Sequence, residues 1–365
     1  MRNVNMANVV VRKFMFANKR KVIGILLSLS IGGCIFLCTT YMVENLKVHA
    51  ELSLISDDGL GSEYRISLKS DSLKDTIPEA VADKIKNMPE TENVYATKYT
   101  MGELQISKNE FLSEEEWSDY FKYQNQEPYY IQRYDGICKQ QEDGNYRIKY
   151  NVYGYDEAMI EQLRDFILEG EIQPETIKNN NQVIVTANMD GQGNYFFYGK
   201  KPGDTITLRV PKTENYTDEL LKFQSGEENY IEKEFEIAAI VNRPLAQEKD
   251  FLNTEVWKNA QSVIMTGEQM EENFGITDYS FINASPADSA DAKIVSNQLL
   301  QVIRDVPKAV LQDYTTAIAT QKGYLGQQQI FFSSIAVILL IISLFHIVNS
   351  MSHTILTRRR EYGII

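Results

Sequence analysis

Hydrophobic positions along the chain gather in two long runs, and the region between them shows shorter, alternating patterns. The first run extends from Val22 to Val43 and the second from Ile330 to Met351, and each contains 22 residues without an Asp, Glu, Lys or Arg. At about 1.5 Å per residue, a helix of this length spans the roughly 30 Å of bilayer hydrocarbon. The pattern therefore predicts two transmembrane helices, one on each side of a large polar region.

The polar region, residues 44–313, switches repeatedly between strand-like and helix-like periodicity. The same order of elements is predicted at both of its ends: a strand at 64–68, a helix at 78–89 and a strand at 92–105, then a strand at 278–284, a helix at 289–304 with Asp288 as N-cap, and a strand near Val310. Because each set adjoins a predicted span, we expect the two sets to form one membrane-proximal subdomain, residues 56–105 and 276–313.

The middle of this region, about residues 145–275, is predicted to be a β-rich insertion. Asp143 and Gly144 predict a turn into a strand that begins near Tyr146. Asp156 predicts the N-cap of a helix that ends at Gly170, and further strands are predicted at 183–186, 205–210, 235–241 and 262–265. The fold class is therefore α+β, with two transmembrane helices flanking a large extracytoplasmic domain.

An acidic and aromatic stretch, residues 109–144, precedes the insertion. Ser113 and Glu116 fit the capping box of a helix, and Trp117 and Tyr120 share one face of that helix. These aromatic residues fit the packing of an amphipathic helix, and they also fit an exposed surface for a ligand. The role of the stretch stays open.

The charges of the segments that flank the spans determine the predicted orientation. Residues 1–21 contain six Lys and Arg residues and no acid, while residues 352–365 contain three Arg residues and one Glu. Short cytoplasmic flanks carry such a basic excess, so both ends are predicted to be cytoplasmic, the first as an amphipathic segment on the inner membrane surface. Residues 44–329 are then extracytoplasmic. They hold 28 of the 37 basic residues and 49 of the 50 acidic ones, a balance that excludes nucleic acid as a partner.

The three cysteines cannot form a disulfide framework outside the membrane. Cys34 and Cys38 lie in the first apolar run, and Cys138 stands alone in the external region. Signal-peptide cleavage and lipidation at Cys34 are both disfavoured, because the run is longer than the apolar core of a signal peptide and Cys34 is followed by further apolar residues.

Both spans contain small or polar residues at helical spacing. Gly24, Ser28 and Gly32 recur every four residues, a spacing that lets helix backbones approach closely in lipid. His346 and Asn349 belong to a polar stripe in the second span, for which hydrogen bonding between helices is favoured over proton coupling. Residues 44–55 and 314–329 are predicted to continue the two spans as stalk helices.

Catalytic, cofactor and metal sites find no support in the sequence. The external region contains one histidine, His49, so it offers neither a His-based triad nor a His-rich zinc site. Residues 188–199 begin like a calcium loop but end in Gly199 rather than Glu, and residues 194–201 lack the pattern of a phosphate loop. The chain is therefore predicted to be non-catalytic and to hold no cofactor.

The order of these features resembles the beginning of an FtsX/MacB-type ABC transporter permease. The chain has a basic preamble, a span, a large external domain, a second span and then RRREYGII. The external region adds VYGYDEA, LEG, QVIVTANM, a Gly-Asp-Thr strand entry and FEIAAIVNRP, which are similar, in that order, to the MacB-like external domain. The likeness covers nearly the whole chain.

The resemblance implies a function and a set of coupling residues. The family's basic-acidic-Gly motif maps onto Arg359, Glu361 and Gly363, with Arg358 beside it, although Tyr362 stands where an aliphatic residue is more usual. Such permeases act as dimers, with a second copy or a paralogue, and with an ABC ATPase on a separate polypeptide. The resemblance therefore implies that residues 352–365 couple a movement driven by ATP to the external domain. It also implies residence in the bacterial plasma membrane, contact with membrane lipid, and action on an external substrate, protein or peptide.

One departure from the family leaves alternatives open. Family members continue after the motif with further spans, whereas this sequence stops at Ile365, so a truncated form, a gene fragment or a split subunit is expected. The alternative function is a two-span membrane sensor whose acidic external domain binds a peptide or a cation. The transported substrate does not follow from the sequence.

Overall fold

Two long helices and one β-rich unit make up the computed structural model of the chain. The structure describes residues 19–53, 60, 62–70, 72–107, 138–189, 193–216, 226–245 and 262–357. The chain divides into a helical unit, Met1–Leu54 with Ala317–Ile365, and a folded unit, Ile55–Thr316. The predictions for residues 1–18, for Ser113 and Glu116, and for residues 358–365 lie outside the described residues.

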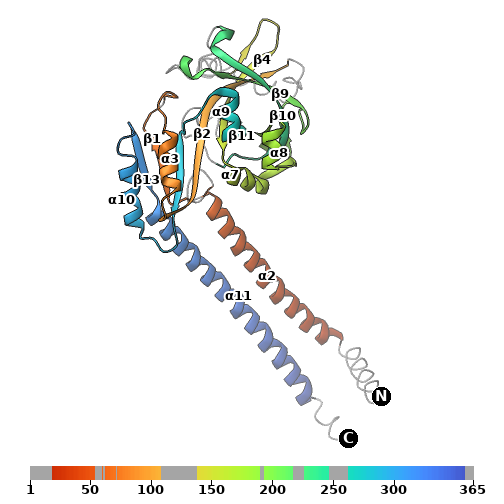
Figure 1. Cartoon of the computed structure of the whole chain (residues 1–365). Coiled ribbons are helices and arrows are strands. Elements are labelled where there is room, and N and C mark those ends of the chain that lie inside the picture. The colour runs from red at the N-terminus through yellow and green to blue at the C-terminus, as the bar shows by residue number, and fades with distance from the viewer. Residues whose placement is uncertain are drawn as a thin grey trace, which may run out of the picture. The chain divides into compact units, whose positions relative to one another are not determined.

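The helical unit contains the two predicted spans as parts of longer helices. Helix α2 (Lys19–Ser53) has 35 residues and helix α11 (Thr315–Thr357) has 43, and each is continuous along its length in Figure 1. Helix α2 continues beyond the first apolar run to Ser53, and α11 includes residues 315–329 before the second run, while residues 54 and 55 of the first predicted extension lie outside the described residues. That the two extensions form a stalk stays a prediction. Among the described residues, one helical segment, Thr315–Ile342, is long and apolar enough to cross a membrane. That α2 also crosses one stays a prediction.

One end of the folded unit is a four-stranded antiparallel sheet covered by two helices. The strands β1 (Tyr64–Leu68), β2 (Thr91–Ile106), β12 (Phe281–Pro286) and β13 (Ala309–Asp313) lie in the order β13-β1-β12-β2. Helix α3 (Glu79–Lys86) follows β1 and helix α10 (Ala292–Val302) follows β12. The two chain segments thus form two interleaved β-α-β units, as the sequence predicts.

The helices α3 and α10 share one core with this sheet. Val81 and Ile85 of α3 and Val295 and Leu299 of α10 are buried in a single cluster with Ile66 of β1. Figure 1 shows both helices beside β1 and β13. The residues Val81 and Ile85, and Val295 and Leu299, recur at helical spacing, and the helices predicted at 78–89 and 289–304 are confirmed as α3 and α10.

Two details of this end were predicted wrongly. The strand predicted from Asp278 begins at Phe281, because Asp278 and Tyr279 lie in the connection that precedes it. The N-cap of α10 is Asp291 rather than Asp288, because the Asp291 carboxylate accepts a hydrogen bond from the Lys293 backbone N–H at 2.8 Å. Because the prediction places the N-cap at Asp288 in place of Asp291, the predicted helix begins three residues too early.

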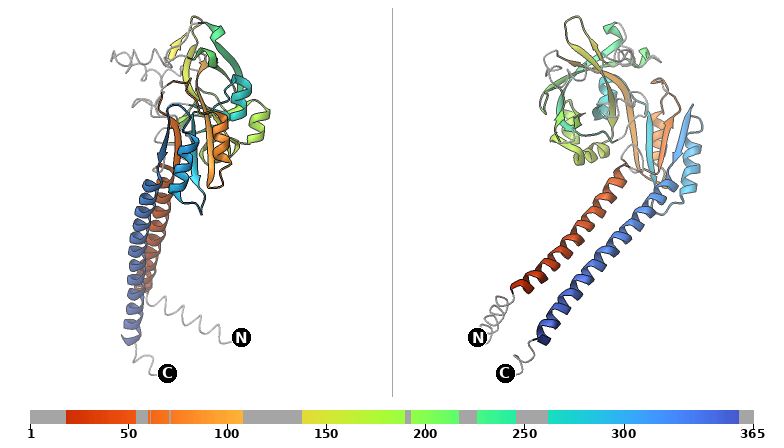
Figure 2. Two further views of the ribbon diagram at one scale, coloured as in Figure 1. Left: turned by 60° about the vertical axis from the view of Figure 1, so that its left-hand side comes forward. Right: turned by 180° about the vertical axis from the view of Figure 1, so that it is seen from behind.

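The other end of the folded unit is a closed β-barrel. Beyond Thr97, β2 pairs with β4 (Tyr146–Tyr155) on one side and with β9 (Thr205–Pro211) on the other. β9 continues through β10 (Tyr230–Val241), β6 (Gln182–Thr186) and β11 (Ser262–Thr266) back to β4. In the right-hand view of Figure 2 these strands curl around a common centre. Residues 98–106 thus belong to the barrel although they precede the predicted insertion.

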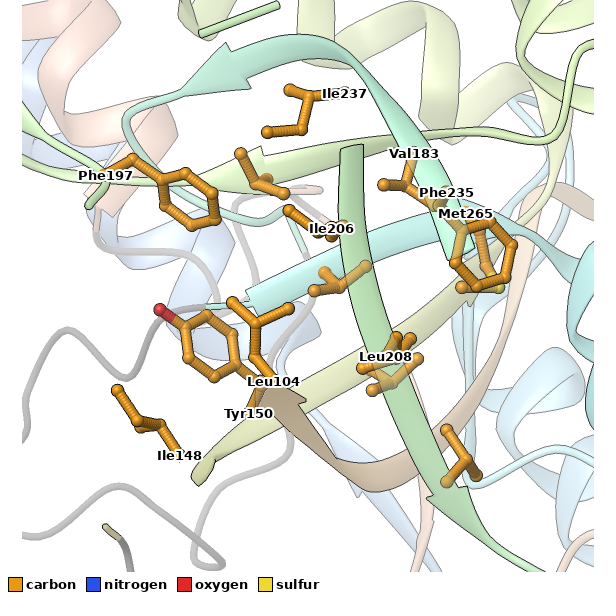
Figure 3. Packing of buried hydrophobic residues seen from close by; sticks show 14 of the residues in the cluster. Leu104, Ile148, Tyr150, Val183, Phe197, Ile206, Leu208, Phe235, Ile237 and Met265 are labelled. Carbon is orange, nitrogen blue, oxygen red and sulfur yellow. The ribbon is translucent and has the colours of Figure 1, made fainter. Parts of the chain in front are cut away.

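Alternate residues of the barrel strands fill its interior. Figure 3 shows Leu104, Tyr150, Leu208, Phe235 and Met265 pointing into one cluster from five strands. Every second residue of a strand points to the same face, so the intervening residues point outward. Helix α9 (Gly267–Phe274) also contributes to this cluster, through Met270 and Phe274. The predicted strands at 183–186, 205–210, 235–241 and 262–265 are confirmed as β6, β9, the second half of β10, and β11.

The outer face of the barrel carries a second core under short elements. Helix α7 (Glu157–Gln162) begins at its predicted N-cap, since the Asp156 carboxylate accepts a hydrogen bond from Met159 N–H at 2.9 Å. Further elements follow the chain: the 3-10 helix η1 (Leu163–Phe166), strand β5 (Ile167–Gly170) and helix α8 (Pro174–Asn179). Met159, Leu163 and Ile177 from these helices are buried against the outward-facing residues of the barrel.

The predicted end of the helix after Asp156 is wrong. The α-helix stops at Gln162, and Gly170 ends strand β5, which pairs with β10. Gly170 has a φ of +93°, and a Cβ there would lie 2.3 Å from the Ala238 carbonyl oxygen. Glycine is therefore required at this position by the close approach of β10, not by the C-terminus of a helix.

The remaining described elements are short connections. Strand β3 (Cys138–Gln140) pairs with β4 across a turn in which the Asp143 carboxylate accepts a hydrogen bond from Asn145 N–H at 2.9 Å, and this confirms the predicted turn. Strands β7 (Asn188–Met189) and β8 (Tyr195–Phe196) form a small ribbon. The 3-10 helices η2 (Thr213–Asn215) and η3 (Glu227–Asn229) lie between β9 and β10.

Candidate functional site

A cavity of about 310 Å³ lies where the barrel joins the four-stranded end of the folded unit. Strand β2 changes partners at this point, pairing with β12 through Thr97 and with β4 from Lys98 onward. The residues that line the cavity come from four separate segments: Leu73, Lys74 and Thr76 from the β1–α3 connection, Tyr99 from β2, Thr213 and Tyr216 after β9, and Gly275, Ile276, Thr277, Asp278 and Ser280 between α9 and β12.

Two tyrosines form the aromatic wall of the cavity. The Tyr99 hydroxyl donates a hydrogen bond to Asn151 Oδ1 at 2.9 Å, and the Tyr216 hydroxyl lies 3.0 Å from Thr100 Oγ1. Both side chains are nearly fully buried, at 4% and 8% exposure. Because both phenol groups have partners within the protein, the two rings contribute mainly apolar surface to the cavity.

The segment before β12 forms the polar wall. The Thr76 hydroxyl donates a hydrogen bond to Asp278 Oδ2 at 2.7 Å, which links the β1–α3 connection to this segment. Backbone hydrogen bonds between Ile77 and Tyr279 reinforce the same link, and Ser280 N–H donates to the Thr97 carbonyl at 2.9 Å. Asp278 is half-buried and Lys74 is exposed at the edge of the cavity.

The buried phenol of Tyr216 gives a pH-dependent prediction. Burial raises the pKa of Tyr216 from 10.0 to about 12, while the Thr100 hydrogen bond acts in the opposite direction. A pKa that is higher in the folded state means that the stability supplied by the neutral phenol is present below pH 10 and is lost as the pH rises through about 12. The stability difference between the wild type and Tyr216→Phe should therefore shift by about 2–3 kcal/mol across this interval.

Urea unfolding of both forms in detergent, followed by circular dichroism at a series of pH values, measures this shift. The comparison is made between two chains that differ in one hydroxyl, so the titration of all other groups cancels to first order. A difference that stays constant from neutral pH to pH 12 would contradict the assigned burial of the phenol.

Four polar side chains meet in a second cluster, outside the cavity. Glu103 on β2 lies directly opposite Lys149 on β4 and Arg209 on β9. Lys149 Nζ lies 2.7 Å from Glu103 Oε1, Arg209 Nε lies 3.1 Å from Glu103 Oε2, and the Tyr230 hydroxyl donates to Oε1 at 2.7 Å. The three charged side chains are at most 6% exposed.

The electrostatics of this cluster favour a structural role. Burial lowers the pKa of Lys149, because desolvation disfavours its charged form, and the nearby Glu103 partly offsets this effect. The Arg209 guanidinium also stacks on the Tyr230 ring, with its carbon 3.6 Å from the ring centroid. Both carboxylate oxygens of Glu103 are therefore occupied by partners within the sheet.

The residues predicted to mediate packing between the spans lie on the long helices. Gly24, Ser28 and Gly32 fall on α2, and His346 and Asn349 fall on α11. Gly24 is exposed, and among the described residues no atom lies within 4 Å of a Cβ built on it. Asn349 is also exposed, while nothing is described of the side chains at the other three positions. The packing role stays a prediction.

The predicted coupling residues follow the last described residue of α11. Arg358, Arg359, Glu361 and Gly363 lie beyond Thr357, outside the described residues. The structure describes no group of three or more His, Cys, Asp or Glu side chains able to hold a metal ion in the parts of the chain that it covers. The calcium-like loop, residues 188–199, is described only in part, since residues 190–192 lie outside the described residues.

The cavity and the buried cluster were both missed by sequence reasoning. The cavity residues are up to about 200 positions apart in the chain, so no local motif joins them. Glu103, Lys149 and Arg209 alternate with apolar neighbours, a pattern that normally marks the solvent face of a strand. A charge at the same place in three neighbouring strands is the signal that would have indicated the cluster, once the strand pairing was known.

Among known proteins, the chain is similar to solved structures but matches no family model and no curated sequence. The periplasmic region of MacB from Actinobacillus actinomycetemcomitans is 9% identical over 74% of this chain and 97% of its own length, with a TM-score of 0.39. The extracellular domain of the noncanonical ABC-type transporter YknZ from Gram-positive bacteria is 10% identical over 69% of this chain and 100% of its own length, with a TM-score of 0.36. Function is therefore inferred from this chain's own helices and side chains.

Proposed function

We propose that the chain is a membrane subunit of an FtsX/MacB-type ABC transporter, which transmits movement from a separate ATPase to its external domain. The subunit itself is non-catalytic, acts with a second copy or a paralogue, and resides in the bacterial plasma membrane with both ends in the cytoplasm. The movement of the external domain serves to export or extract a substrate, or to control an external partner.

The observation that carries this proposal is the continuity of α11 with the sheet. Strand β13 ends at Asp313 and α11 begins at Thr315. The Asp313 carboxylate caps the helix, since it accepts hydrogen bonds from the Thr315 backbone N–H at 3.0 Å and from the Thr315 hydroxyl at 2.6 Å. We infer that a displacement of the helix is passed on to β13, which pairs along its length with β1.

The length of α11 is the second support. At about 1.5 Å per residue, its 43 residues extend for about 65 Å, roughly twice the thickness of the bilayer hydrocarbon. The helix contains both the polar residues 315–329 and the apolar run 330–351. In the proposal, this single continuous helix connects the predicted cytoplasmic segment to the external domain.

The distribution of charge is the third support. Nine of the 37 basic residues and one of the 50 acidic residues lie in the two short end segments, 1–21 and 352–365. This asymmetry favours a cytoplasmic location for both ends, because basic flanks are retained on that side. A cytoplasmic location brings Arg359, Glu361 and Gly363 to the side of the membrane where an ATPase acts.

The cavity favours a second candidate function, a two-span sensor. A ligand in the cavity would contact both the barrel and the four-stranded end, and α11 would carry the resulting change toward the cytoplasm. The two candidates differ in the partner that they require. A transporter subunit binds an ABC ATPase, whereas a sensor binds a signalling protein.

Purification of the tagged chain from its native membranes in mild detergent separates the two candidates. We expect an ABC ATPase to co-purify with the wild type, and we expect Glu361→Lys and Gly363→Trp to lower both its amount and its ATP hydrolysis severalfold. Tyr362→Phe serves as a control within the same segment and should leave both unchanged. Recovery of a kinase without an ATPase would support the sensor, and unchanged ATP hydrolysis in both variants would overturn coupling through this segment.

A further inference from the structure

The cavity between the barrel and the four-stranded end has the size of a small-ligand site. Its volume of about 310 Å³ lies at the lower end of the range for ligand pockets, roughly 300–1,000 Å³. It therefore accommodates a molecule of the size of an amino acid or a dipeptide.

The polar wall presents hydrogen-bond acceptors. Asp278 Oδ2 accepts a hydrogen bond from the Thr76 hydroxyl, and Asp278 Oδ1 has no hydrogen-bond partner among the described residues. Thr277 and Ser280, which both carry a hydroxyl group, line the same cavity. A primary ammonium group has three donors and no acceptor, so this wall complements it in charge and in hydrogen bonding.

The aromatic wall of the cavity is apolar, in contrast with the polar wall. The hydroxyls of Tyr99 and Tyr216 are bonded to Asn151 and Thr100, and both residues line the cavity with their aromatic rings, of which the Tyr99 ring also lies 5.2 Å from the Tyr153 ring. Leu73 and Ile276 add apolar surface to the lining. This wall therefore suits an apolar side chain of the ligand.

The side chain of Lys74 places a positive charge at the edge of the cavity. Lys74 lines the cavity and has no ion pair in the described parts of the chain, whereas the neighbouring Asp75 is bound by Lys308 at 2.6 Å. The Lys74 ammonium is therefore available to a carboxylate or a carbonyl oxygen.

We propose that this cavity binds the α-ammonium end of an apolar amino acid or short peptide. Asp278 and the hydroxyls of Thr277 and Ser280 hold the ammonium group, the Tyr99 and Tyr216 rings contact the side chain, and Lys74 faces the carboxylate or carbonyl group. This inference goes beyond the transport role, because it assigns a ligand class to the external domain whichever partner the cytoplasmic segment binds.

Isothermal titration calorimetry of the full chain in detergent tests the proposal with three probes. Free leucine and leucyl-alanine carry the ammonium group, and N-acetyl-leucine lacks it. We expect leucine or leucyl-alanine to bind, and the stronger of the two shows whether an amino acid or a peptide is the better ligand. N-acetyl-leucine should bind at least about tenfold more weakly, because a charge-assisted hydrogen bond is lost.

Two variants and a control assign the binding to this cavity. Asp278→Asn should weaken the binding of the two ammonium-bearing probes at least about tenfold. Thr277→Trp should abolish the binding of every probe, because the larger side chain fills the cavity from its exposed edge. Asp288→Asn, an exposed carboxylate on the connection before α10, should change nothing. Absence of binding to the wild type, equal binding of N-acetyl-leucine, or wild-type affinity in both cavity variants would each overturn the proposal. None of these outcomes depends on a co-purifying ATPase.

Discussion

Glu103→Ala is expected to destabilise the folded unit by about 3–5 kcal/mol, the range found when one partner of a buried ion pair is removed. The Glu103 carboxylate is the shared partner of Lys149, Arg209 and Tyr230 in the described structure. Without it, two buried cations lie close together and have lost their common anion. Urea unfolding of the full chain in detergent, followed by the near-ultraviolet circular dichroism of the buried tyrosines, measures the loss.

The physical reason lies in the cost of desolvation. A buried charge that loses its partner keeps the full penalty of having left water, so the effect exceeds the net contribution of the intact pair. Lys149 can relieve part of this penalty by releasing its proton, because burial already lowers its pKa. Arg209 cannot do so, since a guanidinium stays protonated in proteins.

A control and a rescue variant make this expectation specific. Glu234→Ala removes an exposed carboxylate from β10 and should change stability by no more than about 0.5 kcal/mol. Adding Lys149→Met to Glu103→Leu replaces one ion pair by apolar side chains and should recover part of the loss. A loss below about 1 kcal/mol in Glu103→Ala, as for an exposed pair, would show that the cluster is solvated.

The fold could be predicted from the sequence wherever one face of an element meets a core. Tyr146, Ile148 and Tyr150 alternate with polar residues, and the resulting strand prediction is confirmed by β4. The faces of α3 and α10 were predictable for the same reason, since Val81 and Ile85 or Val295 and Leu299 recur at helical spacing. Local pattern and tertiary burial agree in these elements.

Elements without such a pattern were missed. Helix α9 follows β11 without a loop, and its capping box between Thr266 and Gln269 is the local signal that was overlooked. Closure of the barrel depends on pairing of β2 with β4 and β9, which lie about 45 and 105 residues further along the chain. No local periodicity specifies which distant strands pair, so the barrel was predicted only as a β-rich portion.

The candidate site was less predictable than the fold. The cavity depends on how the β1–α3 connection meets the segment before β12, and the Thr76–Asp278 hydrogen bond that joins them spans 202 residues. The buried position of Glu103 contradicts the usual exposure of charged strand residues. Both features arise from tertiary pairing, and for this reason composition and spacing gave no sign of them.

Placing two arginines in the apolar run of α11 is expected to prevent the second span from inserting. Ile338 and Ile342 lie one helical turn apart and are 55% and 57% exposed, so in the proposed membrane they face lipid or a neighbouring helix. An arginine at the centre of a span costs about 2.5–3.5 kcal/mol, so the variant Ile338→Arg with Ile342→Arg should lose about 5–7 kcal/mol of insertion free energy. The first span alone would then hold the chain in the membrane, and residues 358–365 would remain outside the cell.

Reporters fused to the C-terminus detect this change of side. Green fluorescent protein should fluoresce on the wild type and alkaline phosphatase should be inactive on it, and both results should reverse in the double variant. Ala319→Arg with Gly323→Arg has the same spacing on exposed positions of the same helix, outside the apolar run, and should behave as the wild type does. An active phosphatase on the wild type would place the coupling segment on the wrong side for an ATPase, while unchanged reporters in the double variant would show that residues 330–351 do not span the membrane. Either result would overturn α11 as the transmitting element, because the proposed mechanism requires this one helix to join the cytoplasm to β13.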